Sequence, residues 1–126
     1  MTRLTAHRMA LGTGFAQICG NDDMALQYNA GGGVGCISVT ANVAPGLCAQ
    51  FQAASAAGDM VRAHELNERL FPLHQALFTD CSPGPLKYAL TRVHDWLSED
   101  VRLPLVACSA EARKAVDAGL AHAGLI

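Results

Sequence analysis

Histidine and cysteine side chains could do chemistry as metal ligands or nucleophiles, and the chain has five of each. No two histidines have H-x-x-x-H spacing, no cysteines form a C-x-x-C pair, and no cysteine lies at ligand spacing from a histidine. We therefore expect no metal site among these ten residues, which are His7, His64, His74, His94, His122, Cys19, Cys36, Cys48, Cys81 and Cys108.

Two adjacent acidic residues, Asp22 and Asp23, could serve as a general acid and base. Adjacent residues point in different directions on a helix, so these carboxyl groups are poorly placed to share one reacting atom. Aspartate is also a favoured residue at the start of a helix. We therefore predict that one of the two caps a short helix running through Tyr28.

The glycines at positions 31, 32, 33 and 35 resemble a phosphate-binding loop only superficially. Cys36 stands where G-x-G-x-x-G requires its last glycine, and the run precedes a strand candidate, whereas a phosphate loop follows one. The run is better explained as the end of a helix followed by a tight turn.

Two segments of the sequence are candidate strands that could position a functional site. Val34 to Val39 is a short apolar run, rich in β-branched residues and bounded by glycine, which is typical of a buried parallel strand. Phe15 to Cys19 is a second strand candidate, closed by a Gly20-Asn21 turn. Each strand is followed by a predicted helix, and the helix after Val34 to Val39 starts at Pro45. The pattern therefore predicts the order β-α-β-α with parallel strands.

From Asp59 onward the pattern is helical. Asp59 can cap a long helix whose apolar residues recur at three- and four-residue steps, and Pro72 should kink or split that helix near Leu70. A further helix follows the proline loop at residues 82–85, and Ser109 can cap the last one. Two parallel strands buried on both faces need neighbours, so we expect the chain to be the end of a longer one.

Composition limits the kinds of partner and the cell compartment that we expect for this chain. The chain has 126 residues, a net charge of -2 and a pI near 6.2, so no basic field favours nucleic acid or an anionic membrane. Scattered cysteines are expected to be free thiols in a reducing cytoplasm. No segment approaches the ~20 apolar residues of a membrane span, and Met1 to Gly12 lacks the apolar region of a secretory signal.

Four segments carry a resemblance to a known family. In order and spacing the chain resembles the pyruvate-dependent class I aldolases, which include dihydrodipicolinate synthase and N-acetylneuraminate lyase. The resemblance implies a (β/α)8 barrel of ~250 residues followed by a C-terminal helical domain. It makes residues 15–19 the seventh strand and 36–39 the eighth, with residues 1–58 a partial barrel and 59–126 the helical domain. The segments that carry it are Gly20-Asn21-Asp22, Gly32 to Pro45, Ser82 to Lys87, and Arg102 to Leu105.

The resemblance also implies a reaction. Family members of the synthase type condense pyruvate with L-aspartate 4-semialdehyde, on the route to diaminopimelate and lysine, through a Schiff base between a lysine amine and pyruvate. No metal or other cofactor is implied, and a homotetramer is expected. The chain contains only Lys87 and Lys114, neither on a predicted strand, so we expect the Schiff-base lysine and its tyrosine relay to lie before Met1 and this chain alone to be an inactive lyase fragment.

Two binding residues follow from the same resemblance. Ile37, at the end of the eighth strand, corresponds to the family's pyruvate-binding isoleucine, and Gly20, at the end of the seventh, to a glycine of the pocket. No catalytic residue is expected within this chain. Two alternatives stay open: another pyruvate aldolase, such as N-acetylneuraminate lyase or a sugar-acid aldolase, and a non-catalytic helical interaction module.

Overall fold

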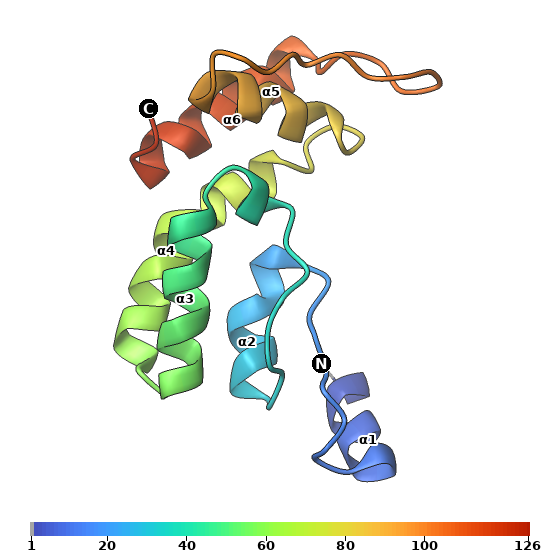
Figure 1. Ribbon diagram of the computed structural model, residues 1–126, viewed down its shortest axis with the longest axis vertical. Helices are drawn as coiled ribbons and strands as arrows, with labels where there is room; N and C mark the ends of the chain where they lie inside the picture. Colours follow the sequence, from blue (N-terminus) through green and yellow to red (C-terminus); the bar gives the residue numbers. More distant parts are fainter. Residues whose placement is uncertain (1) are drawn as a thin grey trace.

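The computed structural model describes residues 2–126, which fold into six α-helices and two short 3-10 helices (Figure 1). Helices α3 and α4 run side by side, α2 lies beside them, and α5 and α6 pack together at the far end of α4 (Figure 1). The α-helices are α1 (Thr2–Leu11), α2 (Ala25–Ala30), α3 (Pro45–Ala57), α4 (Met60–Ala76), α5 (Gly84–Val93) and α6 (Ala110–Ala123), and the 3-10 helices are η1 (Asp22–Met24) and η2 (Thr40–Asn42).

The two predicted strands do not form as strands within residues 2–126. Residues 17–19 and 34–37 instead pair in the predicted parallel direction through a single bridge between Cys19 and Cys36. Three backbone hydrogen bonds hold the pair: Val34 N to Gln17 O at 2.9 Å, Cys19 N to Gly35 O at 2.8 Å, and Ile37 N to Cys19 O at 2.8 Å. The described chain is therefore mostly helical, which agrees with the prediction of a mostly helical part of an α/β barrel protein. The paired segments do not form full strands here, because each has one pairing partner where an inner strand has two.

Local signals set most helix ends as predicted. Pro45 occupies the first turn of α3, which ends at Gly58 with a left-handed φ of 74°. The Asp59 side chain accepts a hydrogen bond from the Arg62 backbone N–H at 3.0 Å and so caps α4. Ser109 caps α6 in the same way, through the Ala112 N–H at 3.1 Å. These caps satisfy donors that a helix leaves unpaired at its start.

The sequence predicted a kink or a split at Pro72, and helix α4 is not split, because it continues through the proline. Leu70 and Leu73, on either side of the proline, are both fully buried. Burying a leucine side chain contributes about 2 kcal/mol, so two such residues offset the hydrogen bond that a proline removes. Tertiary packing therefore overrides the local signal to break the helix.

The core consists of two clusters that meet along α4. The first half of α4 packs against α2 and α3. The second half packs against α5 and α6, where Gly119 comes so close to α4 that an added Cβ would lie 2.9 Å from the Cα of Leu73. Backbone therefore meets backbone at the crossing of α4 and α6.

Several apolar side chains point away from this core. Phe15, Ile18, Val34 and Ile37 are exposed, within or next to the paired segments. The connection from α5 to α6 reaches outward as an arm (Figure 1) and exposes Trp96, Leu103 and Val106. Within residues 2–126, no helix has the length and apolar character needed to cross a membrane.

Candidate functional site

The two predicted binding residues lie where the paired segments end. The Ile37 N–H donates to the carbonyl of Cys19, and Gly20 follows Cys19 directly, so the two residues are neighbours in space. The Ile37 side chain is 73% exposed. A Cβ added at Gly20 would meet no atom within 4 Å, so the space next to it is open. The structure thus brings both residues to one accessible edge.

Asp22 does not cap its own helix, which corrects the sequence prediction. Its carboxylate Oδ2 accepts hydrogen bonds from the backbone N–H groups of Val39, at 2.9 Å, and Thr40, at 3.2 Å. The Cys36 thiol donates to Oδ1 at 3.9 Å. Asp22 is buried, and its carboxylate therefore satisfies the start of η2 from 17 and 18 residues away in sequence.

A second buried contact holds the same turn from α4. The Thr40 hydroxyl lies 2.8 Å from Nδ1 of His74, and the two side chains are 0% and 5% exposed. Burial lowers the pKa of His74, while the charges of Asp22 and Asp23 act in the opposite direction. The lowered pKa favours the neutral imidazole, which can share one hydrogen bond with the hydroxyl in either direction.

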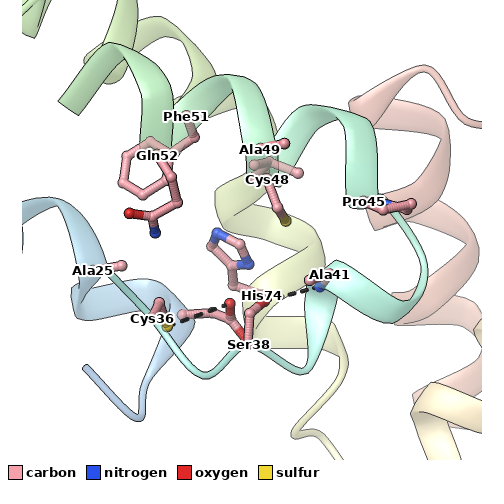
Figure 2. A pocket seen from close by; sticks show the side chains of 12 residues that line it. Ala25, Cys36, Ser38, Ala41, Pro45, Cys48, Ala49, Phe51, Gln52 and His74 are labelled. Atoms are coloured by element: carbon pink, nitrogen blue, oxygen red, sulfur yellow. Dashed lines mark hydrogen bonds between the residues drawn. The ribbon is translucent and has the colours of Figure 1, made fainter. Parts of the chain in front are cut away.

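A cavity of about 240 Å³ lies beside this network, between the 36–41 segment and α3 (Figure 2). The His74 ring lies in its wall between Cys48 and the turn at Ala41 (Figure 2). Burial, reinforced by the charge of Asp22, raises the pKa of Cys36 to about 12 and that of Cys48 to about 11. Both thiols therefore stay protonated near neutral pH and are not activated nucleophiles.

The two lysines lie outside this region. Lys87, at the start of α5, donates from Nζ to the backbone carbonyl of Asp100, and Lys114 is exposed on α6. No group of three or more His, Cys, Asp or Glu side chains that could hold a metal ion occurs in residues 2–126.

Sequence reasoning missed Thr40 and His74. His74 falls on the apolar stripe of α4, four residues after Leu70. A polar residue at such a core position needs a hydrogen-bond partner, and this was the signal that could have identified His74. Thr40 carried no such signal, because its partners Asp22 and His74 lie far away along the chain.

The stability of the chain is expected to fall as the pH drops below about 6.5, the ordinary pKa of histidine. Because the pKa of His74 is lowered in the folded state, the unfolded chain binds a proton first, and acid favours unfolding until His74 also protonates in the fold. Urea unfolding at about pH 7.5 and about pH 5.5 measures this difference. His74→Gln should reduce it, and His64→Gln, exposed on the same helix, should retain it. An equal pH dependence in both variants would contradict the prediction.

Paired parallel segments with candidate binding residues at their carboxyl ends are typical of α/β proteins that bind ligands at one edge of a sheet or barrel. Solved structures define the class more narrowly, as dihydrodipicolinate synthases. The enzyme from Acinetobacter baumannii, solved in complex with pyruvate, matches with a TM-score of 0.91 and 34% identity over 99% of this chain and 43% of that one. The Aquifex aeolicus enzyme matches with a TM-score of 0.91 and 31% identity, over 98% of this chain and 42% of that one.

The chain belongs to the dihydrodipicolinate synthetase family, whose model matches residues 1–123. The 4-hydroxy-tetrahydrodipicolinate synthase of Novosphingobium aromaticivorans is 61% identical over all 126 residues, and that of Zymomonas mobilis is 56% identical. In both cases the match covers 43% of the relative. The chain therefore spans less than half the length of these curated relatives, and the resemblance predicted from the sequence is confirmed at the level of the family.

Proposed function

We propose that this chain supplies part of a 4-hydroxy-tetrahydrodipicolinate synthase, a lyase that condenses pyruvate with L-aspartate 4-semialdehyde in diaminopimelate and lysine biosynthesis. The observation that carries the proposal is the 61% identity to one such synthase over the whole chain, with 43% of that relative covered. The complete protein is proposed to act in the cytoplasm and to form a homotetramer.

Within this proposal, residues 1–58 contribute the seventh and eighth strands of a (β/α)8 barrel with their helices, and residues 59–126 form a C-terminal helical domain. The parallel pairing of residues 17–19 with 34–37 supports the barrel assignment. The exposed apolar side chains on those segments give it further support, because further barrel strands and the residues filling the barrel would cover them.

The proposed chemistry divides between this chain and the rest of the barrel. A lysine outside these 126 residues forms the Schiff base with pyruvate, and no metal or other cofactor takes part. Ile37 and Gly20 line the pyruvate site at the carboxyl ends of their strands, where barrel enzymes bind substrate. The open space at Gly20 and the exposed Ile37 side chain support these roles.

A chimera tests the proposal. The 126 residues replace the matching segment of the Novosphingobium aromaticivorans synthase, and condensation of pyruvate with L-aspartate 4-semialdehyde is assayed. The matched control is the same relative with that segment deleted. We expect the chimera to be active and the deletion to be inactive. A folded chimera without condensation activity would contradict the proposed function.

Ile37→Ala is expected to raise the KM of the chimera for pyruvate by about tenfold, which corresponds to about 1.4 kcal/mol of lost contact. In the chain alone the same substitution should change the free energy of unfolding by less than about 0.5 kcal/mol, because an exposed side chain makes few contacts to lose. Steady-state kinetics and urea unfolding measure the two effects. Val34→Ala, exposed on the same segment but before the bridge, serves as the control. An unchanged KM in Ile37→Ala would remove Ile37 from the pyruvate site.

A further inference from the structure

We propose that Asp22, Thr40 and His74 are positioning residues that hold the segment 36–40 so that Ile37 meets pyruvate in the correct place. This inference rests on the proposed function, because it concerns the same binding site. None of the three side chains needs to touch the substrate. Their role is to fix the backbone on which Ile37 is carried.

The Asp22 carboxylate lies where the parallel pairing stops. On the amino side, Ile37 is fixed by its own N–H, which donates to Cys19 O at 2.8 Å. Within residues 2–126 no backbone hydrogen bond between the two segments follows the one at Ile37. The Asp22 carboxylate instead accepts the N–H groups of Val39 and Thr40. Hydrogen bonds to an ionised carboxylate are stronger and more directional than those between neutral groups.

The position of Asp22 also couples the two segments that carry Gly20 and Ile37. Asp22 comes two residues after Gly20, and the N–H groups that it accepts belong to Val39 and Thr40, two and three residues after Ile37. One carboxylate therefore ties together the two backbone segments that carry the proposed pyruvate contacts. A shift of either segment would break the bonds at Asp22, so this side chain adds to the backbone bond between Ile37 and Cys19 in fixing the spacing between Gly20 and Ile37.

The hydrogen bond between Thr40 and His74 also connects segment 36–40 to α4. The Thr40 side chain is fully buried, and its hydroxyl meets Nδ1 of His74 at 2.8 Å. The leucines that surround His74 along α4 are themselves fully buried, so the helix is a rigid support for the imidazole. The turn η2 is thereby held on one side by Asp22 and on the other by the long helix.

A positioning role and a purely structural role predict different kinetics. A variant that merely unfolds more easily lowers the concentration of active enzyme, so kcat per total protein falls while KM for pyruvate stays constant. A variant that folds but carries Ile37 in the wrong place binds pyruvate more weakly, so KM rises. The number of active sites is counted by borohydride trapping of pyruvate, which separates the two effects.

The experiment introduces Asp22→Asn and Thr40→Val into the chimera and measures KM for pyruvate. We expect each to raise KM by about tenfold, with kcat given per trapped active site. Thr40→Ser keeps the hydroxyl and Asp23→Asn removes an adjacent charge that makes no hydrogen bond to segment 34–42 within residues 2–126, so both should stay within about twofold of the unsubstituted chimera. If Asp22→Asn and Thr40→Val leave KM unchanged while only kcat per total protein falls, the positioning role is overturned.

A second measurement, hydrogen exchange, tests the positioning role without an activity assay. In the isolated chain, hydrogen exchange of the Ile37 amide should accelerate by about tenfold in Asp22→Asn and Thr40→Val, while exchange in α4 is unchanged. Equal protection of Ile37 in these variants and the parent chain would overturn the inference. An inactive unsubstituted chimera would instead reject the proposed function, and the exchange result would still show whether the three residues hold the segment.

Discussion

Replacing Gly119 with alanine is expected to destabilise the chain by about 3 kcal/mol, because the added methyl group has no room. Its Cβ would lie 2.9 Å from the Cα of Leu73, 3.1 Å from the N of Leu73 and 3.3 Å from the carbonyl carbon of Pro72. All three atoms belong to the backbone of α4, which cannot move aside as a flexible side chain could. The two helices would have to separate, and the fully buried residues between them would lose contact.

Urea unfolding followed by circular dichroism measures this effect, and Gly46→Ala provides the matched control. Gly46 also lies within a helix, α3, but an added Cβ there meets nothing within 4 Å. We expect Gly46→Ala to change the free energy of unfolding by less than about 1 kcal/mol. If Gly119→Ala proves as stable as Gly46→Ala, the close crossing of α4 and α6 is wrong.

Incubation of the chain with pyruvate and borohydride is expected to leave its mass unchanged, whereas the chimera should gain one trapped pyruvate per chain. A nucleophilic lysine requires a desolvated pocket that favours its neutral amine. Lys114 is exposed on α6, and the Lys87 ammonium is engaged by the Asp100 carbonyl in an exposed contact. Neither lysine therefore has the surroundings of a Schiff-base residue.

Mass spectrometry of intact protein, followed by peptide mapping, locates any adduct. In the chimera the trapped pyruvate should map to the part contributed by the Novosphingobium aromaticivorans synthase. A stoichiometric adduct on Lys87 or Lys114 would show that the division of chemistry between the two parts is wrong. Omission of borohydride is the control, because an imine that is not reduced is lost by hydrolysis.

The helical part of the fold was predictable because its signals are local. Asp59 and Ser109 each lie three residues before the backbone N–H that they cap, and Gly58 ends α3 at its own left-handed φ. The strands were not predictable in the same way. Whether residues 15–19 and 36–39 form a sheet depends on partners on both sides, and in the described chain each has only the other, through the bridge at Cys19 and Cys36.

The candidate site shows the same division. The sequence correctly predicted that Phe15 to Cys19 and Val34 to Val39 run in parallel, which brings Gly20 and Ile37 together. It wrongly predicted that an aspartate there caps its own helix, because the donors that Asp22 satisfies lie across the turn at Val39 and Thr40. N–H groups far away in the sequence compete with those of the local helix for the aspartate, and sequence spacing does not show which of them it will bind.

The central claim is that this chain carries one wall of a pyruvate site, held in place by Asp22. A crystal structure of the chimera with borohydride-trapped pyruvate tests it most directly. The account predicts that the adduct lies within about 4 Å of Ile37 and Gly20, with the Asp22 carboxylate still accepting the N–H groups of Val39 and Thr40. An adduct that contacts neither residue would contradict it.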